Sequence, residues 1–256
     1  MQLLFLGSGT SHGVPMIGCD CAVCRSGDPR NKRTRASALI RAAGKTLLID
    51  ATTDLRQQVL RHGIKRLDAI LLTHSHADHI LGLDDVRAFS AWQEAPIPVY
   101  GDAETLKVVR RNLDYVFRDS GQPLRWDIPR LELFEMNGCA EVCGVAVTPV
   151  PVLHGRRSIL AFRIGGLAYV TDCSGVPEPS VPLLSEADTL VVGAIRHEPH
   201  PAHFTLAQAV ELVARLKPRR AYVTHISHRL DHEPTEATLP ADVRLAYDGL
   251  DIEVPG

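Results

Sequence analysis

Short apolar runs recur along the whole chain and are separated by polar segments. Most of the runs are rich in β-branched residues and end at Gly, Asp or Pro, a pattern that is typical of strands. They predict strands at Leu3–Leu6, Ala38–Arg41, Thr46–Ile49, Ala69–Thr73, Ile97–Tyr100, Val145–Pro149, Ile159–Ile164, Ala168–Thr171, Thr189–Gly193 and Ala221–Thr224.

Between some of these strands the apolar residues recur every three or four positions, which is the spacing of one helix face. It predicts helices over Thr53–His62, Asp102–Val116 and Thr205–Leu216, and a further helix that starts near Ile80. Thr205 is the expected N-cap of the third helix, and Pro218 ends it. The pattern predicts a single α/β domain over residues 1–256, built on sheets with helices outside, and leaves the topology open.

The composition is that of a folded domain, and it excludes some classes of binding partner. Hydrophobic residues make up 45% and charged residues 23%, which excludes a disordered or collagen-like chain. The net charge of -2 provides no field for holding a nucleic acid backbone. Met1–Leu6 has no basic flank or cleavage site, and no apolar run approaches the roughly 20 residues of a membrane span. We therefore expect a cytoplasmic protein without membrane or nucleic acid partners.

Histidine is the residue type that changes this picture. The chain has 12 His against 6 Phe and 5 Tyr, and its six Cys are too few and too unevenly spaced for a disulfide scaffold. In the cytoplasm, closely spaced thiols bind metal more often than they form disulfides. The composition therefore indicates metal binding.

The densest cluster of candidate ligands follows the predicted strand at Ala69–Thr73. It consists of His74, His76, Asp78 and His79. In an extended segment residues i and i+2 point the same way, so His74 and His76 can converge on one ion. Asp78 and His79 then turn away and can serve a second ion nearby. Imidazole and carboxylate together suit transition metals such as Zn, Ni and Mn.

The motif His-x-His-x-Asp-His after a strand resembles the signature of the metallo-β-lactamase superfamily. The resemblance implies an αββα sandwich, in which two mixed β-sheets are flanked by helices and a dinuclear metal site lies at the sheet edges. It also implies three later ligands at strand ends, for which the sequence offers His154, Asp172 and His225. The family arrangement places His74, His76 and His154 on one ion and Asp78, His79 and His225 on the other, with Asp172 as the bridge.

A second constellation, Cys19, Cys21 and Cys24, offers three thiolates near the N-terminus. Three sulfur ligands need a fourth to close a tetrahedral zinc site. His228, three residues after His225, is the best candidate. We therefore expect a structural zinc loop at about residues 18–35, fastened beside the metal centre.

Together the two constellations resemble the PhnP-like branch of the superfamily, the cyclic phosphodiesterases. The similar segments are Gly18–Cys24, His74–His79, Ile97–Gly101, His203–Leu206, Thr224–His228 and Tyr247–Ile252. The resemblance implies two divalent ions (Mn, Zn or Ni) at the active site, one structural Zn, and a homodimer. It implies hydrolysis of a small phosphodiester, such as 5-phosphoribosyl 1,2-cyclic phosphate, by attack of a metal-bridging hydroxide.

Several further residues are candidates for the reaction. Asp78 and Asp172 would offset part of the metal charge, and His203, at the position of the family's catalytic histidine, would stabilise and protonate the leaving group. Neighbouring candidates without an assigned role are His12, His197, His200, Arg156 and Arg157. The basic run Arg30, Lys32, Arg33 and Arg35 is a candidate phosphate clamp, although a solvated face is the usual meaning of such a run.

Other functions stay open. A transfer RNA 3′-processing phosphodiesterase shares the seven ligands but needs an extended basic arm. A PqqB-like cofactor-biosynthesis protein shares the cysteine loop but is expected to depart from the hydrolase ligand set. From a different class, a metal-binding protein without turnover would carry the same ligands.

Overall fold

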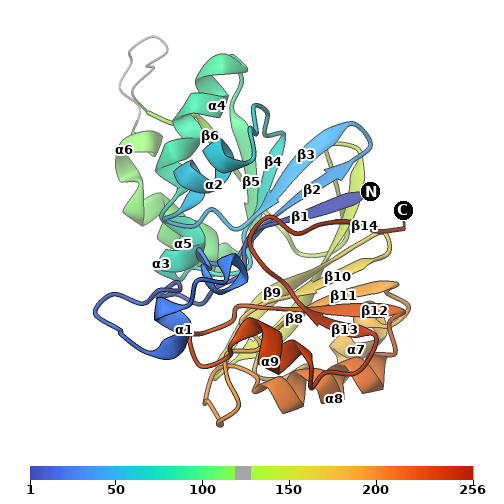
Figure 1. Cartoon of the computed structure of the whole chain (residues 1–256). Helices are drawn as coiled ribbons and strands as arrows, with labels where there is room; N and C mark the ends of the chain where they lie inside the picture. The colour runs from blue at the N-terminus through green and yellow to red at the C-terminus, as the bar shows by residue number, and fades with distance from the viewer. Residues whose placement is uncertain (119–127, 256) are drawn as a thin grey trace.

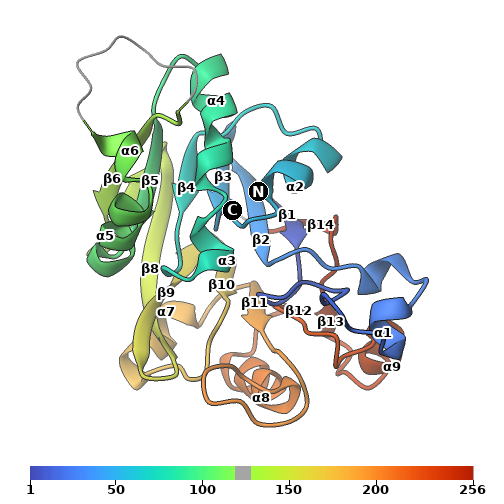
Figure 2. The ribbon, with the colours of Figure 1, turned by 90° about the vertical axis from the view of Figure 1, so that its left-hand side faces the viewer.

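The computed structural model describes residues 1–118 and 128–255. Within them the strands form two seven-stranded sheets that face each other (Figures 1 and 2). The predicted domain of residues 1–256 also includes residues 119–127 and 256, which lie outside this range.

The first sheet mixes antiparallel and parallel strands. Its spatial order is β14 (Asp251–Glu253), β1 (Gln2–Gly7), β2 (Ser37–Ala42), β3 (Lys45–Ile49), β4 (Ala69–Leu71), β5 (Ile97–Gly101) and β6 (Leu131–Glu135). Pairing is antiparallel from β14 to β3 and parallel from β3 to β6.

The second sheet is mixed in the same way. Its order is β13 (Val243–Leu245), β12 (Arg220–Thr224), β11 (Thr189–Gly193), β10 (Leu167–Val170), β9 (Arg157–Ile164), β8 (Val145–His154) and β7 (Ala140–Val142). Pairing is parallel from β10 to β13 and antiparallel from β7 to β10. The predicted two mixed sheets are confirmed.

Apolar faces explain the layering. One buried cluster joins both sheets and includes Phe5, Ile49, Phe162 and Tyr169. The outer face of the first sheet is covered by α2 (Leu55–Arg61), α4 (Arg87–Trp92) and α5 (Ala103–Asn112), and that of the second by α7 (Val181–Leu184) and α8 (Leu206–Leu216). The order is therefore helix, sheet, sheet, helix, as predicted, because each sheet buries one face on its partner and the other on helices.

The remaining elements are short. They are α1 (Ala22–Arg25), α3 (Ala77–Ile80), α6 (Asp114–Phe117), α9 (His232–Glu236) and the 3₁₀ turns η1 (Pro29–Asn31), η2 (Leu83–Val86) and η3 (Glu178–Ser180). In both views α1 lies beside α9, although the two are far apart in the sequence (Figures 1 and 2).

Helix boundaries confirm some predictions and correct others. Thr205 caps α8 in a reciprocal pair with Gln208. The helix expected near Ile80 begins earlier, at Ala77, so Asp78 and His79 belong to it. The helix predicted over Asp102–Val116 divides at Leu113 into α5 and α6.

Strands β6, β7, β13 and β14 were not among the predicted ones. No helix within residues 1–118 and 128–255 combines the length and apolar character needed to cross a membrane.

Candidate metal centre

The His-rich segment connects β4 to α3. His76 has an extended backbone and is the N-cap of α3, which carries Asp78 and His79. The ring centroid of His74 lies 4.5 Å from that of His76 and 4.1 Å from that of His79. The segment therefore gathers its imidazoles at one point.

Three side chains from distant strand ends complete the cluster. His154 is the last residue of β8, Asp172 follows β10, and His225 follows β12. The ligand atoms form two groups, each with all atoms within 4.8 Å of one another: His74, His76 and His154, and Asp78, His79, Asp172 and His225.

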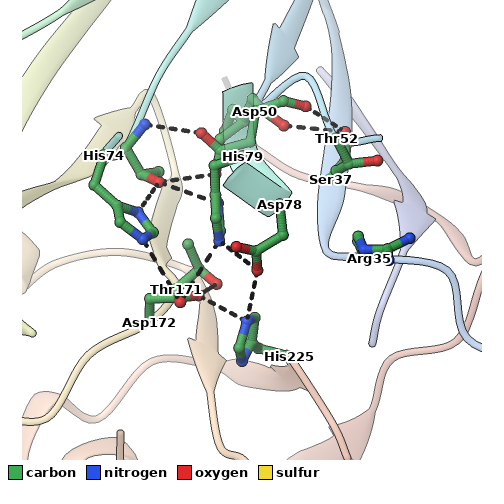
Figure 3. A network of polar contacts seen from close by, with 12 residues as sticks. Arg35, Ser37, Asp50, Thr52, His74, Asp78, His79, Thr171, Asp172 and His225 are labelled. Carbon is green, nitrogen blue, oxygen red and sulfur yellow. Dashed lines mark hydrogen bonds and ion pairs between the residues drawn. The ribbon is translucent and has the colours of Figure 1, made fainter. Parts of the chain in front are cut away.

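Asp172, a member of the second group, also lies near His74 of the first (Figure 3). Its Oδ1 is 3.1 Å from His225 Nε2, and its Oδ2 is 3.5 Å from His79 Nε2 and 3.8 Å from His74 Nε2. The fold thus brings together all seven residues that the sequence singled out for a dinuclear site.

Several ring nitrogens are buried without a hydrogen-bond partner in the described part of the chain. They are Nε2 of His74, Nε2 of His79 and both nitrogens of His225. An unpaired buried polar atom costs about 1–3 kcal/mol. Since imidazole and carboxylate are the ligands of many divalent metals, this donor set fits two such ions.

The protonation states of the carboxyls in the cluster also favour the binding of cations. Burial raises the pKa of Asp78 and of Asp172, but the adjacent His225 and His79 lower both values more, so both carboxyls are ionised at neutral pH. Burial holds the pKa of His74 well below its usual range, which keeps that imidazole neutral. Ionised carboxylates and neutral imidazoles are the forms that bind metal. Asp172 and Asp50 outweigh burial and raise the pKa of His79 well above its usual range, so this ring has to release a proton when a metal binds.

Asp50 is a supporting residue that the sequence reasoning missed. Its side chain is fully buried after β3, and its Oδ2 accepts a 2.7 Å hydrogen bond from His79 Nδ1. Thr73 donates to the same carboxylate from its N–H and its hydroxyl, both at 2.8 Å (Figure 3). These contacts aim His79 Nε2 at the cluster. The one available signal was a charged residue directly after the buried run Thr46–Ile49.

His203 lies next to the cluster, as expected. Its Nδ1 is 4.0 Å from Asp172 Oδ2, and its ring centroid is 4.8 Å from that of His154. The side chain is 14% exposed, and burial with the neighbouring His225 lowers its pKa to about 3. His203 is therefore a neutral hydrogen-bonding group in the free protein.

Of the other candidate residues, two lie close to the cluster and two do not. His200 lies 4.8 Å from His203 between ring centroids, and Arg157 Nη1 lies 3.4 Å from His76 Nε2. His197 and Arg156 are exposed and make no side-chain contact with the cluster among the described residues.

The cationic side chains of the basic run between Arg30 and Arg35 are already bound to other groups of the protein. Arg30 pairs with Asp28, Arg35 pairs with Asp54, and Lys32 donates to Cys24 O. Arg33 is 1% exposed, and its guanidinium donates to the backbone oxygens of Arg30, Ser227 and Leu230 and to Asn31 Oδ1. The solvated-face interpretation is therefore wrong for Arg33, because carbonyls of the loop after β12 surround it.

The cysteine loop forms a second, separate cluster. The Sγ atoms of Cys19, Cys21 and Cys24 lie 3.1, 3.7 and 3.5 Å from His228 Nδ1. Burial raises the pKa of Cys24 to about 11, whereas the Cys24 N–H lowers that of the exposed Cys21. Three thiols and one imidazole converging in this way fit a tetrahedral structural zinc.

This chain matches a known protein family and a solved structure over most of its length. The family described as "Beta-lactamase superfamily domain" matches residues 45–226. The chain belongs to the metallo-β-lactamase superfamily. A solved member, described as a new diphosphatase from the PhnP family, is 45% identical with a TM-score of 0.91 and covers 98% of this chain and 97% of its own. The predicted superfamily and PhnP-like branch are confirmed, and the chain is a metal-dependent hydrolase of this superfamily.

Curated relatives differ in their activities. An octanoyltransferase from Porphyromonas gingivalis is 39% identical over 98% of this chain, but the chain spans only 51% of that protein. Coenzyme PQQ synthesis protein B from Methylobacterium nodulans is 31% identical over 75% of this chain and 72% of its own. Ribonuclease Z from Anoxybacillus flavithermus is 28% identical over 91% and 89%.

Proposed function

We propose that this superfamily member hydrolyses a small phosphodiester, such as the cyclic diester 5-phosphoribosyl 1,2-cyclic phosphate. The observation that carries the proposal is the convergence of seven ligand side chains around Asp172, with buried ring nitrogens left unpaired.

The proposed ligand assignment follows the two groups. His74, His76 and His154 would hold one divalent ion, Asp78, His79 and His225 would hold the other, and Asp172 would be a ligand shared by both. When bound, such a pair of ions lowers the pKa of water and neutralises charge on a phosphate. Mn, Zn and Ni are the proposed occupants.

The residues of the chain supply the remaining functions. The carboxylates of Asp78 and Asp172 would offset part of the positive charge of the two ions, which lowers the repulsion between those ions. His203, next to Asp172, hydrogen-bonds the leaving oxygen through the N–H of its neutral ring and so stabilises the charge that develops there. Arg157, next to His76, offers a guanidinium to a phosphate oxygen. Cys19, Cys21, Cys24 and His228 hold one structural Zn.

A disubstituted diphosphate is the second candidate substrate. Each of its phosphorus atoms is a diester-like centre, with phosphate in place of an alkoxide as leaving group. The observation that supports this candidate is the similarity to the diphosphatase of the PhnP family, which is 45% identical to this chain.

Other activities of the relatives have less support. The net charge of -2 does not favour the RNA substrate of a ribonuclease Z-like enzyme. The complete hydrolase ligand set does not favour a PqqB-like role. We place the octanoyl transfer of the P. gingivalis protein outside the shared half, since the match spans 51% of it.

A substrate panel tests the proposal. Purified protein loaded with Mn, Zn or Ni is assayed on bis(p-nitrophenyl) phosphate, 5-phosphoribosyl 1,2-cyclic phosphate, 2′,3′-cyclic nucleotides, a disubstituted diphosphate and a thioester. We expect cleavage of the phosphorus substrates, fastest for the small cyclic diester. Thioester cleavage with intact phosphorus substrates, or metal binding without any turnover, would refute it.

A further inference from the structure

A cavity of about 230 Å³ lies between the metal centre and the cysteine loop. The loops after β1, β11 and β12 line it, with side chains that include His12, Arg196, His200, Ser227 and Arg229. His200 is one of these, and it contacts His203 at 4.8 Å between ring centroids. The side chains of His200 and His203 thus separate the cavity from the ligands His154 and Asp172.

Backbone hydrogen bonds hold the cavity floor in place. Ile226 N–H donates to Ser8 O at 2.8 Å, Thr10 N–H to Ile226 O at 3.3 Å, and Ser227 N–H to Ile195 O at 3.2 Å. The three loops are therefore joined to one another. With liquid water taking about 30 Å³ per molecule, the space holds several waters or one phosphate-sized group without rearrangement.

The lining is basic. It contains two Arg and three His, and none of the described lining residues is a carboxylate. Arg196 donates to Glu198 O and Pro199 O, which fixes its guanidinium at the wall, and the exposed Glu198 carboxylate, 4.0 Å from its Nε, offsets part of its charge. His200 Nδ1 accepts the Ala202 N–H, so its Nε2 carries the proton of the neutral ring and can donate. Arg229 and His12 are exposed and make no side-chain hydrogen bond with the described part of the chain.

A second cavity, of about 420 Å³, has the opposite character. It borders the metal centre at His74 and Arg157, and its wall carries Asp102 and Glu104 together with Ser158. Asp102 already caps α5 through the Thr105 N–H at 2.7 Å. Carboxylates repel a phosphate and accept hydrogen bonds from hydroxyls, so this cavity suits a polyol and not a second anion.

We propose that the cavity lined by His12, Arg196, His200 and Arg229 binds a second, uncleaved phosphate of the substrate. This inference rests on the proposed function and narrows it. The metal centre takes the phosphorus that is cleaved, and the substrate class becomes small phosphodiesters or diphosphates that carry another anionic group. Arg229 and His12 at the mouth are the specificity-determining residues, because the guanidinium of Arg229 and the imidazole of His12 make no hydrogen bond with the described part of the chain and can donate to a ligand.

A matched substrate pair tests the inference. 5-Phosphoribosyl 1,2-cyclic phosphate and ribose 1,2-cyclic phosphate differ only in the second phosphate. We expect the wild type to prefer the first in kcat/KM by about 10–100-fold, the range of one or two charge-assisted hydrogen bonds. The double variant His12→Ala/Arg229→Ala should lose most of this preference through KM, with kcat/KM for ribose 1,2-cyclic phosphate within about twofold of the wild type.

The matched control is Arg111→Ala, which removes one charge from the exposed surface of α5 and should leave the preference unchanged. An unchanged preference in the double variant, or equal losses on both substrates, would overturn the inference.

Binding of ribose 5-phosphate, measured by calorimetry, separates this inference from the proposed function. We expect the double variant to weaken its binding by about tenfold. Weaker binding combined with no turnover of any diester would leave the cavity assignment standing and refute the proposed function. Unchanged binding would refute the cavity assignment alone.

Discussion

The two ligand clusters of this chain differ in how much of their geometry exists before a metal binds. The His and Asp cluster is assembled from strand ends of both sheets, and its rings are held by Asp50, Thr73 and the Ala202 carbonyl. The cysteine cluster takes its three thiols from one loop, in which α1 is a single four-residue turn, and its imidazole, His228, from the loop after β12.

This difference has a thermodynamic meaning. The first cluster belongs to a packed core, so folding organises the ligands and the metal enters a prepared site. The second rests on the small apolar group of Val14, Val23 and Cys24, and hydrogen bonds of Lys32 and Arg33 hold the far end of its loop. A bound metal therefore has to organise mainly the segment that carries the cysteines. The first cluster is thus preorganised for chemistry, and the second depends on its ion for structure.

Removing the bridge should have the largest effect. We expect Asp172→Ala to lower kcat/KM on bis(p-nitrophenyl) phosphate by on the order of 10³-fold, more than the roughly 10–100-fold cost of losing a residue that only supports a ligand. Metal content should fall while circular dichroism stays unchanged, because the strands remain packed. The exposed Asp242→Ala is the control. Activity within tenfold of the wild type would exclude Asp172 from the centre.

Loss of the Asp50 support should have a smaller effect. In Asp50→Asn a single oxygen must replace two that accept from His79 and from both Thr73 donors. We expect about 10–100-fold weaker metal binding and lower activity, measured by titration with Mn or Zn. Thr73→Val, which keeps the carboxylate, should lose less. A lower melting temperature with unchanged metal affinity would mean that Asp50 acts on stability alone.

Asp172 and Asp50 also differ in whether the sequence alone predicts their place in the site. The seven residues could be predicted because four belong to the motif that follows β4 and the other three stand at the ends of later strands, in the order that the superfamily motif implies. Asp50 could not, since its partners depend on how β3 lies beside β4. Arg33 could not either, because a run of charges does not reveal that a loop almost 200 residues later covers it.

Missed strands have a similar cause. β6 and β7 lie at the sheet edges, where few positions are buried and the apolar pattern is weak. β13 and β14, each three residues long, are also too short for periodicity to reveal.

The smallest effect on activity should come from the cysteine loop. Cys21→Ser is expected to remove about one equivalent of zinc and to lower activity by less than about tenfold, with the dinuclear metals retained. Hydrogen exchange should rise over residues 18–35 and stay slow in β4. Cys139→Ser, which alters an exposed thiol, is the control. Simultaneous loss of all metals would show that the two clusters fold as one unit.

His228 links these two regions in a way that bears on zinc supply in the cell. The same residue is a member of the cysteine cluster and lines the basic cavity, with Arg229 directly after it. If the dinuclear centre holds Mn or Ni, a cell short of zinc would produce a protein whose catalytic ions are in place but whose proposed phosphate cavity is disturbed. Under starvation, selectivity would decline before catalysis does.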